Sequence, residues 1–202
     1  MSTSSKRAAG KAKTRQRILT SASRLIHTKG LAGASVGRVM RGAGLTVGGF
    51  YAHFRSKRIL DAEVLREAIA RMRRGWFAGL EARTGVNWLA PAVKRYLSIA
   101  HRDSSDDGCP LPAVLSELTR ADKRTRDVMT ESFESAAQAF ASHAPATPGI
   151  DSRERALATL AMCVGGLTIA RALGDNRASD EVLRACVKWA LPELQNTGGG
   201  RK

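Results

Sequence analysis

The stretch that decides the fold is SVGRVMRGAGLTVGGFYAHFRSK, which spans residues 35–57. Ser35 is a favourable N-cap for one short helix, and Gly44 interrupts that helix. Thr46 can cap a second short helix that reaches Phe54. Two short capped helices joined by a glycine-bearing turn are typical of a helix-turn-helix, whose second helix enters the major groove of DNA. The stretch therefore predicts a DNA-binding motif.

Each of the two short helices has an apolar side and an open side. The inward side of the first is expected to carry Val36, Val39, Met40 and Ala43. In the second, Phe50 and Phe54 lie four residues apart and should pack inward with Leu45. Its open side would carry Thr46, Val47, Gly48 and Tyr51. Gly48 and Gly49 each cost a helix about 1 kcal/mol relative to alanine, which is tolerable where a DNA backbone must come close. A loosely formed turn is the alternative.

Helical patterns flank the motif on both sides. Thr14 can cap a preceding helix that Gly30 ends. Ser56 can cap a longer following helix, in which the apolar positions keep helical spacing. The preceding helix and the two short ones would form a three-helix unit with the motif at about 35–54, and together with the following helix they make up the expected DNA-binding domain, residues 14–74.

The net charge of +15 is concentrated in the first third of the chain. Residues 1–75 contain 17 Lys and Arg against 3 Asp and Glu, whereas residues 76–202 contain 16 against 15. Residues 1–13 are polar and basic and are expected to be a disordered arm. This asymmetry indicates a polyanion-binding module joined to an electrostatically neutral one, although a well-solvated basic face would have the same composition.

The remainder of the chain, residues 75–195, keeps helical spacing between clear breaks. We expect helices at about 87–101, from Pro110, at 122–142, at 152–173 and from Ser179 to about 195, with a flexible tail at 196–202. No stretch alternates apolar and polar residues convincingly, so no strand is expected. The predicted fold is all-α, with about nine helices divided between the N-terminal domain and a larger C-terminal bundle.

The segment AGLTVGGFYAHFRSK, residues 43–57, resembles the helix-turn-helix of the TetR family of repressors. The resemblance covers about residues 14–74, and beyond them it is one of architecture alone. It implies a homodimer that binds an inverted repeat in double-stranded DNA, with the C-terminal bundle serving dimerisation and the binding of an unknown small-molecule effector.

The resemblance also implies which residues contact DNA. Thr46 and Tyr51 would contact phosphates or bases, and the residues expected to contact phosphates are Ser35, His53 and Lys57. Val47 departs from the family pattern, in which this position is polar or basic in many relatives. Its side chain can touch a thymine methyl but cannot hydrogen-bond a base edge. Gly48 belongs to the same expected surface.

The helices at 152–173 and after Ser179 are the candidates for the dimer interface. Gly165 and Gly166 offer a flat position for close helix approach. Together the two helices from each subunit could form a four-helix interface. Its expected residues are Leu160, Val164, Gly165, Leu167, Val182, Cys186 and Trp189. The alternative is that these faces pack only within one chain.

An effector pocket in the C-terminal bundle would mix aromatic, flexible apolar and polar side chains. The candidates are Trp88, Tyr96, His101, Cys109, Leu111, Leu115, Met129, Phe133 and Met162, most of which are expected to be ordinary core residues. Cys109 precedes a helix and lies in a Gly-Cys-Pro-Leu element that resembles one in a TetR branch including the N-ethylmaleimide reductase repressor. It is therefore a candidate redox or electrophile sensor, although Asp106 and Asp107 would raise its pKa.

Several other classes of protein are disfavoured. Residues 1–13 lack the apolar region of a secretory signal, and the longest uncharged run, between Arg155 and Arg171, falls short of a membrane span. Three scattered cysteines without a CxxC pair fit a reducing bacterial cytoplasm and give neither a disulfide framework nor a metal site. No cofactor is expected.

The alternatives to a transcriptional regulator are an enzyme and a nonspecific nucleic-acid packaging protein. His101-Arg102-Asp103 imitates a kinase catalytic-loop tripeptide, but no phosphate loop accompanies it, so an enzyme is not expected. A nonspecific packaging protein would share the basic arm without needing a neutral apolar module of some 120 residues. The sequence thus favours a sequence-specific transcriptional repressor that a small-molecule or electrophilic effector releases from its operator.

Overall fold

A computed structural model describes residues 3–104 and 106–192, and within them the chain is helical apart from connections and one isolated β-bridge between Thr147 and Ile150. The predicted all-α class is confirmed. The elements are α1 (Thr3–Gly33), α2 (Val36–Gly42), the 3-10 helix η1 (Val47–Ala52), α3 (Lys57–Phe77), α4 (Val86–Tyr96), α5 (Ile99–Asp103), α6 (Leu111–Leu118), α7 (Lys123–His143), α8 (Ser152–Leu173) and α9 (Arg177–Ala190).

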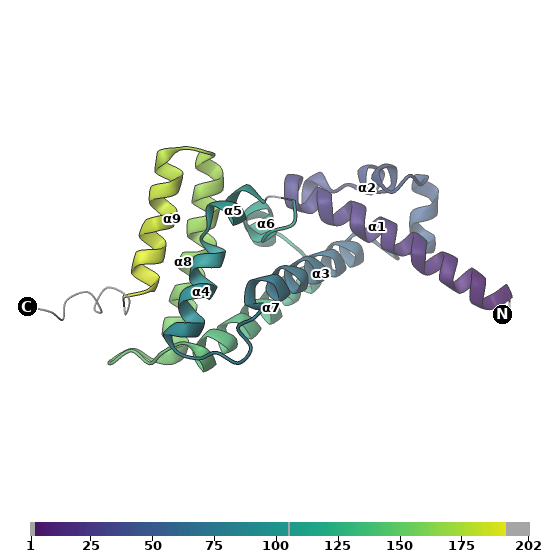
Figure 1. The fold of residues 1–202 in the computed structure, drawn as a ribbon. Helices are drawn as coiled ribbons and strands as arrows, with labels where there is room; N and C mark the ends of the chain where they lie inside the picture. Colours follow the sequence, from purple (N-terminus) through teal and green to yellow (C-terminus); the bar gives the residue numbers. More distant parts are fainter. Residues whose placement is uncertain (1–2, 105, 193–202) are drawn as a thin grey trace, which may run out of the picture.

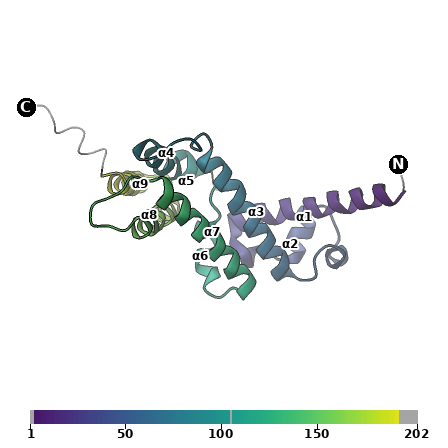
Figure 2. The same cartoon turned by 90° about the horizontal axis from the view of Figure 1, so that it is seen from below.

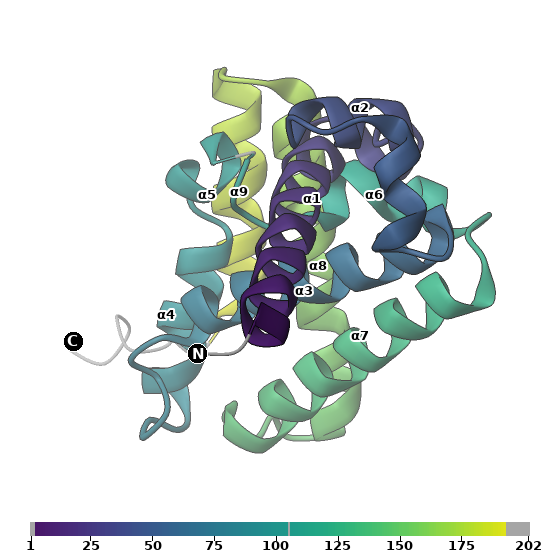
Figure 3. The same cartoon turned by 90° about the vertical axis from the view of Figure 1, so that its right-hand side faces the viewer.

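The helices form two ends joined by α3 and α7. In Figure 1, α1 and α2 lie at one end of the molecule, whereas α8 and α9 stand side by side at the other. Seen from below in Figure 2, α3 and α7 run next to each other between these ends. Figure 3 looks from the end that carries α1 and α2, with the remaining helices behind them. Two helices connect α1 to the other end, because α3 packs on both α1 and α7, and α6 packs on both α1 and α8.

The first helix begins earlier than expected. Residues 3–13, predicted as a disordered arm, form the opening turns of α1, and the described side chains among them are exposed. Their alanines and lysines have high intrinsic helix propensity, which sustains a helix without burial once the following turns have nucleated it. Gly30 ends the regular helix as predicted, because its backbone turns to φ 68° and ψ −175°. Residues 1–2 and the expected tail at 196–202 lie outside the described residues.

Two helix boundaries in the C-terminal part also differ from the prediction. The helix expected over 87–101 is divided at Leu97, and Ser98 caps α5 by accepting a hydrogen bond from the amide of His101. The last helix begins after Asn176, whose side chain accepts from the amide of Ser179. Ser179, expected to be the cap, is instead fully buried and donates its hydroxyl proton to the carbonyl of Ala170. Both deviations depend on contacts between distant segments, which local propensity does not contain.

An aromatic cluster holds the C-terminal end of α3 against α4 and α7. Its members are Trp76, Phe77, Trp88, Tyr96 and Phe140. The indole of Trp76 donates to the carbonyl of Ala92 at 2.8 Å, so its one polar atom is paired. Arg95 donates through one nitrogen to the carbonyls of Gly75, Trp76 and Ala78, which otherwise lack partners at the end of α3.

The tripeptide His101-Arg102-Asp103 has a structural role. The buried guanidinium of Arg102 forms ion pairs with Asp103, Asp175 and Asp180 at 2.7 to 3.0 Å and donates to the hydroxyl of Ser179. These contacts hold α5 against the turn between α8 and α9. The tripeptide therefore contributes to packing.

By length and composition alone, α8 could cross a membrane. A buried core helix satisfies the same criterion, and α8 packs against α7 on one side and α9 on the other.

Candidate DNA-binding surface and effector cavity

The two short helices of residues 35–54 pack as the sequence predicts. Val39, Met40 and Ala43 are buried, and Phe50 and Phe54 stack with their ring centres 5.7 Å apart. The guanidinium of Arg15 lies over the Phe54 ring at 4.6 Å, which ties η1 to α1. The second element is a 3-10 helix rather than an α-helix, as is common for short helical segments.

The opposite side of η1 is open. Tyr51 is 70% exposed and Val47 is 53% exposed, although both are large apolar side chains. Thr46 is exposed and its hydroxyl makes no capping hydrogen bond. Gly48 has open space where a Cβ would stand, so the fold itself does not require glycine there. The Tyr51 ring makes an edge contact with the ring of Phe50, but most of its surface is open and suited to contact with a partner.

Ser35 and Lys57 have structural roles besides any contact with DNA. The Ser35 side chain caps α2 by accepting from the amide of Arg38. The ammonium of Lys57 donates to the carbonyl of Leu31 at 2.9 Å and pairs with the carboxylate of Asp61 at 2.6 Å. An ammonium has three donors, so one remains for a phosphate. Burial raises the pKa of Asp61, and Lys57 opposes that rise. Replacing Lys57 would therefore also destabilise the domain.

Four exposed arginines of the same segment were not predicted as site residues. They are Arg38 and Arg41 on α2, Arg55 between η1 and α3, and Arg58 in the first turn of α3. His53, predicted to contact phosphate, is half-buried, and its Nδ1 has no partner among the described residues. The charge of the segment indicated these arginines, and the structure leaves their side chains exposed.

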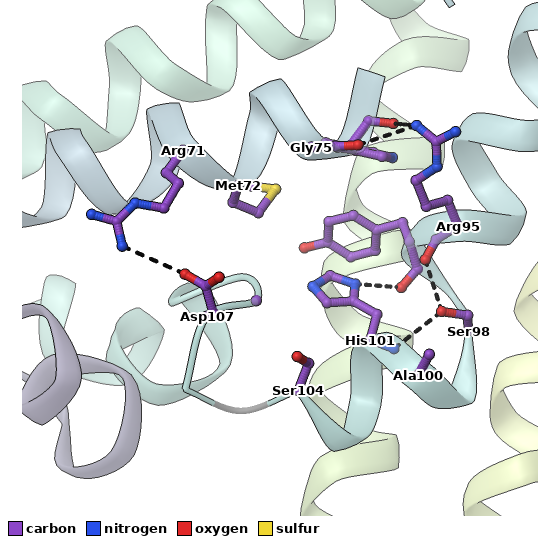
Figure 4. A pocket seen from close by; sticks show the side chains of 12 residues that line it. Arg71, Met72, Gly75, Arg95, Ser98, Ala100, His101, Ser104 and Asp107 are labelled. Carbon is purple, nitrogen blue, oxygen red and sulfur yellow. Dashed lines mark hydrogen bonds and ion pairs between the residues drawn. The ribbon is translucent and has the colours of Figure 1, made fainter. Parts of the chain in front are cut away.

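A cavity of about 460 Å³ opens between α3, α4, α5 and the segment before α6. Figure 4 shows Arg71, Met72 and Gly75 on one wall and Arg95, Ser98, Ala100 and His101 on the other, with Ser104 and Asp107 below. Trp76, Tyr96 and Gly108 complete the lining. A second, much smaller cavity of about 30 Å³ shares Met72, Trp76 and Tyr96 with the first and extends toward α7 and α8.

Five of the nine candidate effector residues line one of the two cavities. Tyr96 and His101 line the larger cavity. The candidates that line the smaller cavity are Tyr96, Leu111, Met129 and Phe133. Trp88 is buried in the aromatic cluster, Leu115 is exposed on α6, and Met162 is half-buried on α8. Arg71, Arg95 and Asp107 were not predicted, because exposed charges carry no sequence signal that separates a cavity wall from an ordinary surface.

His101 is held as a neutral imidazole. Its Nδ1 lies 2.7 Å from the carbonyl of Tyr96, and its Nε2 accepts from the amide of Cys109 at 2.9 Å. The ring thus needs one N–H and one lone pair, which is the neutral tautomer. Burial lowers the pKa of His101, in agreement with this pattern. His101 therefore positions the segment before α6 and adds no charge to the cavity.

The Cys109 thiol is fully buried and lines neither cavity. Burial raises the pKa of this thiol, and interactions with Tyr96, the Leu111 backbone and Arg171 oppose the rise. The helix N-terminus that suggested a lowered pKa belongs to α6, but desolvation is the larger effect. Exposed Asp107, the expected cause of a raised pKa, pairs with Arg71 instead.

One hydrogen-bonded contact connects the cavity wall to the DNA-binding domain. His27 of α1 is buried, with Nδ1 2.8 Å from the carbonyl of Ser23 and Nε2 3.1 Å from the carbonyl of Gly108. Gly108 also lines the larger cavity. Nearby, the carboxylate of Glu117 on α6 accepts from the amide of Ala32 at 2.9 Å. A movement of the cavity wall near Gly108 would therefore change a contact that holds α1.

Comparison with known proteins agrees with this arrangement. Residues 18–64 match the family described as bacterial regulatory proteins, tetR family. The N-terminal part of the chain is therefore similar to the regulatory proteins of the tetR family. No curated protein matches the sequence.

Solved TetR-family structures share the fold of the chain along most of its length. The reduced form of NemR from E. coli has a TM-score of 0.71 at 18% identity, covering 88% of this chain and 95% of that one. A TetR-family regulator from Agrobacterium tumefaciens has a TM-score of 0.74 at 19% identity, covering 92% and 98%. A regulator from Saccharomonospora viridis in complex with choline has a TM-score of 0.71 at 20% identity, covering 90% and 96%.

The expected dimer face divides into buried and open residues. Leu160 and Leu167 are buried within the subunit, so they cannot form a contact surface, and this part of the prediction is wrong. Their side of α8 faces the subunit's own core. Val164, Gly165, Val182 and Cys186 are half-buried, whereas Trp189 is 77% exposed. Ile169 and Leu173 of α8, which were not predicted, are also large exposed apolar residues.

We predict that Tyr51→Ala weakens DNA binding at least tenfold and changes the free energy of unfolding by less than about 0.5 kcal/mol, because the side chain is exposed. Phe50→Ala is the matched control. It removes a buried ring and should cost about 3–5 kcal/mol of stability. Fluorescence anisotropy with labelled operator DNA and urea unfolding measure the two effects. Equal DNA affinity of Tyr51→Ala and the parent protein would contradict the proposed face.

We further predict that Cys109 and Cys163 react slowly with a thiol reagent at pH 7.5 in the native protein, whereas half-buried Cys186 reacts first. Burial raises the pKa of all three thiols, and solvent does not reach Cys109 and Cys163 in the folded protein. Thiolate is the reactive form, so both its low population and limited access slow the reaction. Mass spectrometry of alkylated peptides with and without urea measures the order. Fast native labelling of Cys109 would instead support electrophile sensing.

Proposed function

We propose that the chain is a transcriptional repressor that binds an inverted-repeat operator as a homodimer and leaves it when a small molecule occupies the 460 Å³ cavity. The observation that carries the proposal is the open face of η1, where Val47 and Tyr51 are exposed above two buried phenylalanines. Such a protein acts where its DNA is, in the bacterial cytoplasm. A dimer seated on an operator blocks access to the DNA that it covers.

The surface charge supports nucleic acid as the partner. Arg38, Arg41, Arg55 and Arg58 are exposed on the elements that precede and follow η1, and the exposed basic residues of the early turns of α1 extend the charge toward the N-terminus. Arginine and lysine contacts to phosphates hold a recognition element in register, while side chains such as Tyr51 and Val47 contact the groove. The paucity of base-edge donors on η1 suggests that part of the specificity comes from DNA shape.

The exposed apolar residues of α8 and α9 support a dimer. Trp189, Ile169 and Leu173 would be costly to leave in water, and they lie on the helix pair farthest from the DNA-binding end. A two-fold axis at α8 and α9 would place two copies of η1 for two half-sites of an inverted repeat.

The contact between His27 and Gly108 offers a route from effector to DNA. Gly108 belongs to the cavity wall, and its carbonyl faces a ring nitrogen of α1. If an effector displaces this wall, α1 loses one anchoring contact and η1 changes position with it, since Arg15 of α1 packs on Phe54. Release by a small molecule thus needs no contact between that molecule and DNA.

The first test is selection of bound sequences from random DNA, followed by binding to the selected repeat and to a scrambled duplex. We expect an inverted repeat, a preference of at least 10³-fold over the scrambled duplex, and a steep loss of affinity between 50 and 200 mM salt. Trp189→Glu should sediment as a monomer and bind the repeat weakly. A nonspecific packaging protein would instead bind both duplexes alike.

The route through His27 can be tested without an effector. His27→Asn keeps an amide near the position of Nδ1 but cannot reach Gly108, whereas His27→Gln places an amide near Nε2. One hydrogen bond contributes about 1 kcal/mol net, so His27→Asn should weaken operator binding by about fivefold, and His27→Gln by less. Melting temperatures identify any variant that is simply unfolded. Equal operator affinity of the two folded variants would exclude this contact from the route.

A further inference from the structure

We infer that the effector is an amphipathic organic anion. Its carboxylate displaces Asp107 from the ion pair with Arg71, and its body accepts a hydrogen bond from Tyr96. This inference rests on the proposed function, because it names the chemical class of the molecule that enters the 460 Å³ cavity.

The charges of the cavity favour an anion. The lining of the cavity contains two guanidinium groups, those of Arg71 and Arg95, and one carboxylate, that of Asp107. His101 is neutral and adds no charge. Arg95 already satisfies the carbonyls at the end of α3. Arg71 is therefore the cation that remains for a ligand.

The ion pair between Arg71 and Asp107 is weak enough to exchange. Its atoms are 3.5 Å apart, and the two side chains are 47% and 74% exposed. Pairs of this kind contribute little stability. A ligand carboxylate can form two shorter parallel hydrogen bonds with the same guanidinium, which is the stronger arrangement. In Figure 4, Arg71 and Asp107 face each other beside Met72, where an entering ligand would meet them.

Tyr96 is a second and independent indication of a ligand. Its ring is 1% exposed, and its hydroxyl has no nitrogen or oxygen partner among the described residues, only the neighbouring thiol of Cys109, which is a weak hydrogen-bonding group. Burial, followed by the Cys109 thiol, raises the pKa of Tyr96, so the group is a neutral phenol that can donate a proton. A buried hydroxyl that has only a thiol beside it is poorly satisfied, and a ligand oxygen would be a stronger acceptor. Tyr96 lines both cavities, so the oxygen would lie where they meet.

The apolar end of the ligand would point toward the smaller cavity. Met72 and Trp76 line both cavities together with Tyr96. Beyond them, the smaller cavity is bordered by Met129, Phe133 and Leu160. Its present volume of about 30 Å³ holds little more than one water molecule, but methionine side chains adapt readily to an apolar group. The ligand is thus charged at Arg71 and apolar beyond Tyr96.

A cation or a neutral molecule fits less well. A cation would need a carboxylate in the cavity wall. The carboxylate of Asp107 is already paired with Arg71. A neutral molecule would leave that pair in place and so would not act on the segment that continues to Gly108. Only an anion competes with Asp107 directly, and Asp107 is adjacent to the residue whose carbonyl contacts His27.

The experiment uses three probes on a methoxynaphthalene scaffold, whose ether oxygen can accept the hydrogen bond from Tyr96: the carboxylate, the nearly isosteric carboxamide and the trimethylammonium. Titration calorimetry with the free full-length protein should give the tightest binding for the carboxylate, at least tenfold tighter than the carboxamide. The trimethylammonium should not bind measurably. Equal binding of carboxylate and carboxamide, tighter binding of the cation, or no binding of any probe would each overturn the inference.

Four variants identify the residues. Arg71→Gln should weaken carboxylate binding about tenfold and leave carboxamide binding within twofold, whereas Asp107→Asn should tighten carboxylate binding because the competing charge is gone. Tyr96→Phe should weaken both probes about threefold or more, yet melt close to the temperature of the parent protein, since the buried hydroxyl that it removes has only the Cys109 thiol beside it. Arg66→Gln is the matched control, because Arg66 also belongs to α3 but pairs with Glu131 outside this cavity.

Failure of this inference can be distinguished from failure of the proposed function. Operator binding by the ligand-free protein tests the function and does not depend on the probes. If the protein binds its operator but the carboxylate has no advantage, only the effector class is wrong. If the carboxylate binds as expected but no duplex is preferred, the cavity assignment stands and the repressor proposal falls.

Discussion

The packing of α3 against both ends of the molecule is the constraint on which the rest of the structure depends. Its first turn contacts the end of α1 through the hydrogen bond from Lys57 to Leu31, and its last turns are fixed by Trp76 and Arg95. One rigid helix thus forms a wall of the cavity and the support of η1. Any rearrangement around Trp76 must be taken up by bending α3, by sliding it on α7, or by shifting α1.

The helix-turn-helix could be predicted from sequence because its determinants are local. Caps at Ser35 and Ser56, the break at Gly30 and the spacing of Phe50 and Phe54 act within a few residues, and the structure retains them all. The cavity could not be predicted in the same way. Its charged residues, Arg71, Arg95 and Asp107, come from three segments and acquire a common wall only through tertiary packing. The dimer prediction shows the same limit, because helical spacing located the apolar residues of α8 but not which of them face the subunit's own core.

Two histidines beside the segment before α6 have different hydrogen-bonding demands. His101 faces one acceptor and one donor, so the neutral ring satisfies both. His27 faces two carbonyl oxygens, those of Ser23 and Gly108, and a neutral ring has only one N–H for them. Only a doubly protonated ring would satisfy both carbonyls. The hydrogen bonding of His27, which joins α1 to the cavity wall, is therefore less complete than that of His101. The contact of His27 with Gly108 is thus the easier of the two to break when the wall moves.

Distance decides how an anion in the cavity can weaken DNA binding. Arg71 lies 14 residues beyond Lys57 on the same helix, or about 21 Å at 1.5 Å per residue. The Debye length at physiological ionic strength is about 8 Å, so the ligand's charge is largely screened before it reaches the DNA-binding surface. Neutralising Arg71 would remove little of the attraction between the basic domain and phosphates. The ligand must instead act through packing, and its charge matters locally, where it separates Asp107 from Arg71 and so frees the segment that contacts α1.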